Sequence, residues 1–211
     1  MLSSVSTTEA LPEGFSRAAA ADERFAIRGR VDGGHNLTAW SSHKFFIGPD
    51  AVRNLGVFLP QFLGDIRNTK LRPFAPQGYP DAWRTPRRWS RAEKSPFERC
   101  RILNPHPDMA DIARLQHQFA LAFPDIGKPA ITASWAGMVD VTHDTLPVVD
   151  HAPIPGLIVA TGMSGHGFGI APGMAKVIAD LVQGRAPQHE MSPFRYKRFF
   201  DGTPTKTSTA I

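Results

Sequence analysis

The fold is decided by one stretch, which runs from residue 156 to residue 184 and reads GLIVATGMSGHGFGIAPGMAKVIADLVQG. Its apolar run from Leu157 to Ala160 predicts a short strand that is covered on both faces. From Ala171 onward apolar residues recur at helical spacing, with Pro172 in the first turn and Gly184 at the C-terminus. The stretch therefore predicts a strand, a glycine-rich turn and a helix.

The turn between the strand and the helix carries glycines at positions 162, 165, 167 and 169. A turn without side chains at a helix N-terminus lets a ligand approach the backbone and meet unpaired N–H groups, which favours an anion or a polarised carbonyl. The glycines do not keep the G-x-G-x-x-G spacing, and no Gly-Lys-Ser/Thr follows them, so a P-loop is excluded. The alternative is a turn that only lets the helix pack closely on a sheet.

Length and composition indicate one or two globular domains, because the chain has 211 residues of which 42% are hydrophobic. No apolar run approaches the roughly 20 residues of a membrane span. Residues 1–9 lack the charged start and apolar centre of a signal peptide, so a cytoplasmic location is expected. The single cysteine, Cys100, excludes an internal disulfide and a cysteine-based metal cluster.

The net charge of +5 is concentrated around a run of arginines and tryptophans at residues 83–91. Basic residues interleaved with aromatic ones are compatible with nucleic-acid binding. The run is short and is followed by Glu93 and Glu98, which favours a solvated loop without a nucleic-acid partner.

The remaining chain contains strands and helices in alternation. Residues 1–24 are expected to form a polar surface segment, with a helical turn at residues 18–21. A hairpin is predicted from Phe25–Val31 and Asn36–Trp40, joined at Asp-Gly-Gly. The other expected elements are a helix opening at Gly48 and kinked at Pro60, an irregular segment over 71–101, a helix from Pro107 to Phe123, and a strand over 131–139.

The sequence gives little evidence for a metal site or for a nucleophilic serine. The eight histidines have no H-E-x-x-H or other tight ligand spacing. Ser164 lies in Gly162-Met163-Ser164-Gly165, one residue short of the G-x-S-x-G turn of serine hydrolases. No metal ligand is therefore predicted, and Ser164 is not expected to be a nucleophile.

Several motifs occur together in the second half of the chain: Trp135-Ala136-Gly137, Thr142-x-Asp144-x-x-Pro147-Val148, Pro155-Gly156-Leu157, Gly162-x-Ser164-Gly165-His166-Gly167-Phe168, and the ending Ser192-Pro193-Phe194 with Arg198-Phe199. In combination they resemble the C-terminal part of FAD-dependent oxidoreductases of the D-amino-acid oxidase class, which includes glycine oxidase, sarcosine oxidase and D-amino-acid dehydrogenase. The earlier Arg28-x-Arg30-Val31-Asp32-Gly33-Gly34 resembles the substrate domain of that family.

This resemblance implies a FAD site and an amine-oxidising reaction, in which a hydride leaves the carbon that bears the nitrogen. Gly137 stands where some sarcosine oxidases carry the cysteine that tethers the flavin, so FAD is expected to be non-covalent. No catalytic residue is assigned. The residues implied to lie against the flavin are Gly162, Met163, Ser164, Gly165, His166, Gly167, Phe168, Gly169 and Ile170.

Three departures from the family pattern limit the assignment. Val139-Asp140 replaces the Arg-Pro that grips a substrate carboxylate in glycine-oxidase relatives, and Gly169 replaces a lysine of sarcosine oxidases. The βαβ unit with G-x-G-x-x-G that holds the ADP half of FAD has no counterpart here. The expectation is thus a fragment, or a chain that needs a partner supplying the nucleotide-binding half.

The predicted architecture is α+β, with a mixed, largely antiparallel substrate-domain sheet, packed helices, and the C-terminal strand, turn and helix of a FAD-binding domain. Residues 1–130 are assigned to a partial substrate-binding domain, 131–186 to the return segment of the FAD-binding domain, and 187–211 to a tail. The expected function is FAD-dependent oxidation of an amino acid or secondary amine. A truncated remnant without catalysis, or a regulatory or assembly module, is the alternative.

Overall fold

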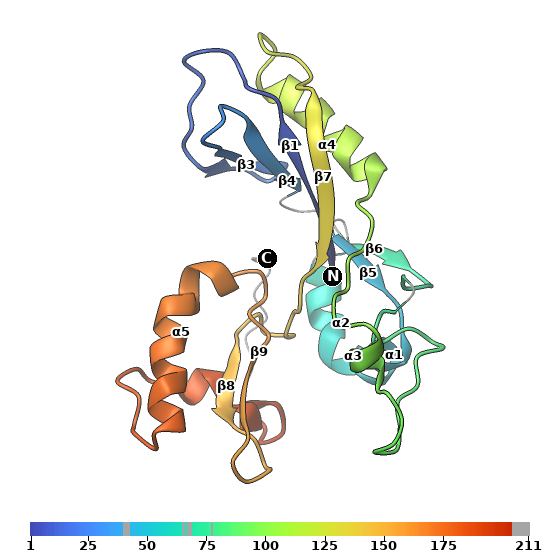
Figure 1. Ribbon diagram of the computed structural model, residues 1–211, viewed down its shortest axis with the longest axis vertical. Helices are drawn as coiled ribbons and strands as arrows, with labels where there is room; N and C mark the ends of the chain where they lie inside the picture. The colour runs from blue at the N-terminus through green and yellow to red at the C-terminus, as the bar shows by residue number, and fades with distance from the viewer. Residues whose placement is uncertain (40–42, 65, 67–68, 77, 204–211) are drawn as a thin grey trace. The chain divides into compact units, whose positions relative to one another are not determined.

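The computed structural model describes residues 1–39, 43–64, 66, 69–76 and 78–203. The chain divides into two compact units. The first unit comprises residues 1–55 and 65–138, and the second comprises residues 56–64 and 139–211. The first unit contains a mixed sheet with a helix packed on it, and the second contains a small sheet with a helix beside it (Figure 1). The prediction of an α+β fold with a mixed sheet is confirmed.

A largely antiparallel sheet forms the first unit. Among the strands that the structure describes, only β5 and β6 run parallel, and β7 (Ile131–Met138) pairs with β1 outside the main strand path. The predicted strand over 131–139 is therefore present. The strand order is β2 (Ala20–Ala21), β3 (Phe25–Gly29), β4 (His35–Ala39), β1 (Leu2–Thr8), β5 (His43–Phe46) and β6 (Thr69–Arg72).

The strand β1 lies at the centre of this sheet, so the prediction of a polar surface segment at the N-terminus is wrong. Four of its hydroxyl side chains are buried, those of Ser4, Ser6, Thr7 and Thr8. All of these except Ser6 have a hydrogen-bond partner among the described residues. The Ser4 hydroxyl accepts a hydrogen bond from the Asp108 amide at 2.9 Å, and the Thr8 hydroxyl accepts one from the His35 amide at 3.0 Å. Residues 20–21 form β2 and not a helical turn.

The predicted hairpin is confirmed as the antiparallel pair β3 and β4, with Phe25 opposite Ala39 and Gly29 opposite His35. Trp40, the last residue of the expected return strand, lies outside the described residues. In the turn, the Asp32 carboxylate accepts a hydrogen bond from the Gly34 amide at 3.1 Å, and Gly33 has a φ of +84°. A left-handed residue at this position favours glycine.

The helix α4 (Met109–Ala122) packs on β1, β3 and β4 of the sheet. The Asp108 carboxylate caps its N-terminus by accepting a hydrogen bond from the Ala110 amide at 3.0 Å. The predicted helix is present, and its apolar residues Ile112, Leu115 and Phe119 are buried while Met109 is exposed. The core consists of Ile112, Leu115 and Phe119 from the helix and Phe25, Ile27, Leu37 and Ala39 from the hairpin.

One predicted helix is two helices in the structure. α1 (Pro49–Arg53) ends at Asn54, whose backbone and side-chain amides both donate to the Asp50 carbonyl at 3.0 and 2.9 Å. α2 (Leu55–Gly64) contains Pro60, so the break falls before the proline and not at it. The irregular segment expected over 71–101 holds the end of β6 and one short helix, α3 (Pro96–Arg99).

The second unit contains an antiparallel pair, β8 (Val148–His151) and β9 (Ile158–Thr161), with the helix α5 (Gly167–Val182) beside it (Figure 1). The 3₁₀ turns η1 (Ser192–Phe194) and η2 (Tyr196–Phe199) follow. Gly184 ends the helix region as predicted, with a φ of +68° and its amide bonded to the Leu181 carbonyl.

Two predictions about this stretch need correction. The helix begins at Gly167, one turn before Ala171, because the glycine-rich residues already adopt helical geometry. The strand is not covered on both faces, since Ala160 and Thr161 are exposed. Among the described residues β8 is the strand that pairs with β9, so one edge of β9 has no neighbour there.

Candidate functional site

The glycine turn begins where β9 ends. Gly162 has a φ of +68°, and its amide donates a hydrogen bond to the Asp140 carboxylate at 2.7 Å. A Cβ atom at this position would lie 2.5 Å from the Thr142 methyl group, so the Thr142 side chain or the turn would have to move. Gly162 is therefore required both by its backbone conformation and by the space around it.

Within the turn, the side chain of Ser164 is fully buried. The residue has a φ of +49°, which is uncommon for a residue with a side chain, and no measurable solvent exposure. Its hydroxyl donates to the Gly162 carbonyl at 3.1 Å and accepts from the Thr142 amide at 3.4 Å. These partners belong to Gly162 and Thr142, and neither is a side-chain base.

The outer part of the turn is open to solvent. Gly165 has a φ of +81° and is exposed, as are His166, Phe168 and Gly169. The amides of Gly169 and Ile170 both donate hydrogen bonds to the His166 carbonyl. By helix geometry the preceding amides, those of Gly167 and Phe168, have no intrahelical acceptor and lie at the positive end of the α5 dipole.

A second turn, at residues 142–146, contacts the glycine turn through Thr142 and Ser164. The Thr142 hydroxyl donates to the Leu146 carbonyl at 2.8 Å, and the Leu146 amide donates to the Asp144 carboxylate at 3.1 Å. Thr145 adopts a φ of +59°. The Thr142 backbone and side chain then meet the Ser164 hydroxyl, so the conformation of one turn is coupled to that of the other.

A buried ion pair fixes the second turn to the C-terminal segment. The Arg198 guanidinium donates to both oxygens of Asp144, at 2.7 and 3.1 Å, and to the Leu146 carbonyl at 2.8 Å. Both side chains are only 2% exposed. Burial alone would raise the pKa of Asp144, but the hydrogen bonds from Arg198, the Leu146 amide and the Thr142 hydroxyl, together with the Arg198 charge, outweigh it and hold the pKa below its ordinary value.

His143 lies beside this pair, between Phe58 and Phe199, at ring-centroid distances of 6.0 and 4.9 Å. Burial lowers the pKa of His143; the Asp144 charge opposes this effect, and the Arg198 charge adds to it. The histidine is therefore neutral near pH 7 and has a packing role.

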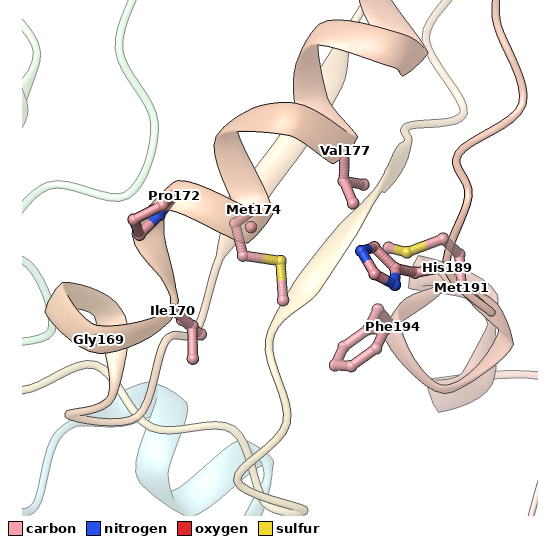
Figure 2. Close-up of a pocket in the computed structure, with 9 residues that line it drawn as sticks. Gly169, Ile170, Pro172, Met174, Val177, His189, Met191 and Phe194 are labelled. Atoms are coloured by element: carbon pink, nitrogen blue, oxygen red, sulfur yellow. The ribbon is translucent and has the colours of Figure 1, made fainter.

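A groove of about 440 Å³ follows one side of α5 (Figure 2). Its helix side is formed by Ile170, Met174 and Val177, with Gly169 and Gly173 leaving room between them. Figure 2 shows His189, Met191 and Phe194 of the C-terminal segment on the opposite side. Of the nine residues predicted against the flavin, the groove includes Gly169 and Ile170.

The structure adds residues that sequence reasoning did not assign to the site. Asp140 and Thr142 hold the turn directly, and the pair of Asp144 and Arg198 holds it through Thr142. The signal for these residues was available in the Thr142-x-Asp144 and Arg198-Phe199 motifs. The signal for Asp140 was not, because this residue departs from the family pattern.

The described residues contain no group of three or more histidine, cysteine, aspartate or glutamate side chains arranged to hold a metal ion. In the part of the chain that the structure describes, no helix combines the length and apolar character needed to cross a membrane.

The chain belongs to the FAD dependent oxidoreductase family, whose model matches residues 3–181. Over 77 residues it is 35% identical to the D-amino acid dehydrogenase of Cereibacter sphaeroides, a match that covers 36% of this chain and 18% of that protein. Over 60 residues it is 38% identical to the N-methyl-L-tryptophan oxidase of Citrobacter koseri, covering 28% of this chain and 15% of that protein.

Solved structures share the fold. The L-amino acid deaminase of Proteus myxofaciens superposes with a TM-score of 0.81 at 24% identity, covering 94% of this chain and 44% of that protein. Glycine oxidase of Geobacillus kaustophilus superposes with a TM-score of 0.55 at 18% identity, and the match covers 93% of this chain and 38% of that protein. The chain thus spans less than half the length of these relatives.

FAD is the cofactor of this family, and the residues of the turn fit a flavin ring. A flat ring needs backbone without side chains, and a Cβ atom added at Gly169 or Gly173 would meet nothing within 4 Å. The electron-rich edge of a reduced ring needs hydrogen-bond donors, which the first turn of α5 presents. Within the described residues there is no counterpart of the glycine fingerprint for the ADP half.

Proposed function

We propose that the turn at residues 162–170 and the N-terminal end of α5 form the part of a FAD site that meets the isoalloxazine ring. The observation that carries this proposal is an exposed turn, free of large side chains at Gly165 and Gly169, that is fixed from below by Ser164 and opens onto a helix N-terminus. We propose non-covalent binding, since Gly137 offers no tethering side chain.

Bound FAD would accept a hydride from the carbon that bears the nitrogen of an amine, and the imine product would hydrolyse. The protein residues contribute position and charge. The α5 N-terminus stabilises negative charge, and the Gly162, Ser164 and Thr142 contacts keep the turn in place before the substrate arrives. No residue is assigned as a catalytic base.

We propose an amino acid or a secondary amine as the substrate class. The names of the dehydrogenase, the N-methyl-L-tryptophan oxidase and the L-amino acid deaminase support this class, because each names an amino acid or an N-methyl amino acid. They include both stereochemical series, so the substrate configuration is left open. Val139-Asp140 in place of Arg-Pro implies that another group binds a substrate carboxylate.

We further propose that a polypeptide equivalent to the nucleotide-binding half completes the site. Support comes from the 44% coverage of the deaminase and from the unpaired edge of β9. Residues 1–130 would serve the substrate, 131–186 the flavin, and 187–211 would form a tail. A cytoplasmic location stays a prediction from sequence.

The second candidate is a chain without catalysis, either a remnant or a regulatory or assembly module of such an enzyme. The exposure of Ala160 and Thr161 on β9 favours it, because strands of this apolar type are normally covered. This candidate predicts no flavin binding by the purified chain.

Melting curves with a panel of ligands separate the two candidates. A ring site predicts that riboflavin, FMN and FAD all raise the melting temperature, by roughly 5–10 °C at a hundredfold excess over Kd, while ADP does not. A shift with ADP alone would mean that the chain binds nucleotides elsewhere. No shift with any flavin would favour the non-catalytic candidate.

A further inference from the structure

The segment of residues 71–102, here called the basic segment, carries the whole charge excess of the chain. It holds eight arginines and lysines and three acidic residues, a net charge of +5 that equals the net charge of all 211 residues. The remaining chain is therefore balanced. An excess of charge confined to one surface segment indicates a partner of opposite charge.

The acidic residues of the basic segment are occupied locally. Asp81 pairs with Arg87, Glu93 accepts a hydrogen bond from the Ser90 amide, and Glu98 caps α3 at Ser95. Several arginines have no such neighbour. Among the described residues no hydrogen bond or ion pair engages Arg84, Arg88, Arg91 or Arg101, and all four are exposed.

Large apolar side chains of the same segment face water. Phe74 is 77% exposed and Ile102 is 84% exposed, and Leu71, Trp83, Trp89 and Phe97 are exposed as well. Two contacts bring some of them together. The Trp83 ring nitrogen donates to the Pro73 carbonyl at 3.2 Å, next to Phe74, and the rings of Trp89 and Phe97 meet edge to face at 6.0 Å.

We propose that the basic segment binds the surface of an anionic lipid bilayer. Free arginines would meet the lipid phosphates, and tryptophan rings favour the headgroup level. Phe74 and Ile102 would enter the acyl boundary, where their apolar surface leaves water. Membrane contact of this kind needs no spanning helix.

A single-stranded nucleic acid is the competing partner for arginines and aromatic rings. Aromatic rings stack on bases, but the aliphatic Leu71 and Ile102 have no ring with which to do so. The aliphatic side chains therefore favour a lipid surface over RNA or DNA. The proposal is independent of flavin binding.

Vesicle flotation tests the proposal with the full chain. Vesicles of equal parts phosphatidylcholine and phosphatidylglycerol should carry the protein at low salt and release it at high salt, and phosphatidylcholine alone should carry little. Binding should shift the tryptophan fluorescence to shorter wavelength, because Trp83 and Trp89 enter a less polar layer. Arg88→Gln/Arg91→Gln should weaken partitioning roughly 30-fold, at about fivefold per charge.

The matched control is Arg28→Gln/Lys128→Gln, which removes the same charge from exposed residues outside the segment and should leave partitioning nearly unchanged. Trp89→Ala/Phe97→Ala should reduce binding at equal surface charge, with an unchanged melting temperature as the folding control. Equal losses in both arginine and control variants would overturn the proposal. So would absent vesicle binding, or salt-sensitive binding to a single-stranded RNA with none to vesicles.

Discussion

Two glycines of the site illustrate how differently the same residue type is constrained. Gly162 is left-handed and in contact with Thr142, whereas Gly173 lies in the helix α5 with nothing within 4 Å of an added Cβ atom. The first position needs glycine to fold the turn. At Gly173 neither the backbone conformation nor the surrounding space requires glycine, and its missing side chain leaves one side of the helix open.

We expect Gly162→Ala to destabilise the chain by more than about 1 kcal/mol, because alanine is strained at this φ and would collide with Thr142. Gly173→Ala should instead stabilise it by about 0.5–1 kcal/mol, since alanine has the higher helix propensity. Urea unfolding of both variants measures the difference. Equal effects of the two substitutions would contradict this account of the turn.

Among the described residues of the second unit, Asp144 and Arg198 form the most buried ion pair. Asp144→Asn should lower the free energy of unfolding by about 3–5 kcal/mol, because it leaves the buried guanidinium without its counter-charge. Asp22→Asn is the control, since Asp22 and Arg24 form an exposed pair, and should cost less than about 1 kcal/mol. Urea unfolding followed by circular dichroism compares the two.

The same pair predicts a pH dependence. The pKa of Asp144 is lowered in the folded state, so its ionised form stabilises the fold above the unfolded-state pKa. This contribution is lost as the pH falls below about 4 towards the folded-state pKa. The wild type should therefore lose more stability over this window than Asp144→Asn does. If the free energy of unfolding of the wild type and of Asp144→Asn changed in parallel with pH, Asp144 would titrate without coupling to folding.

Sequence reasoning at this scale found the turn residues but not the residues that hold them. Gly162 and Ser164 belong to a short contiguous motif. Asp140 and Thr142 contact the turn from 22 residues before it, and Arg198, far along the chain, acts on it only through Asp144 and Thr142. Contacts over such separations depend on the tertiary fold, which no local pattern encodes.

At the scale of elements, helices and strands differ in how well their patterns predict them. The apolar stripe of α4 and the glycine after α5 predicted both helices, with ends displaced by a few residues. The strand β1 was missed because Ser4, Ser6 and Thr8 are polar, yet their side chains are buried between neighbouring elements. Its burial comes from its position in the sheet and not from its composition.

Hydrogen exchange should reflect this arrangement of elements. The amides of β1 should exchange slowest, since the strand has hydrogen-bonded neighbours on both sides. The amides of β9 should exchange much faster, because a two-stranded sheet is marginal and one edge of β9 has no strand beside it in the described residues. Equal protection of β1 and β9 would mean that β9 has a neighbour in solution.

At the scale of the whole molecule, the chain joins a sheet unit to a unit that carries the candidate flavin turn. The fold class and the family followed from motif combinations, because glycines and turn residues are fixed by backbone geometry. Substrate identity did not follow, since Val139-Asp140 departs from the pattern that would have named the carboxylate ligand. A specific ligand depends on side chains that replace one another freely on the same fold.

The measurement that tests the central claim most directly is a riboflavin titration, followed through the visible absorption band of the flavin, with the wild type and two variants. Gly169→Leu places a side chain in the open space of the turn, and Ala179→Leu places the same side chain at an exposed position near the far end of α5. We predict saturable binding to the wild type and to Ala179→Leu, and weak or absent binding to Gly169→Leu. Equal binding by all three, or binding by none, would contradict the assignment of the turn as a flavin site.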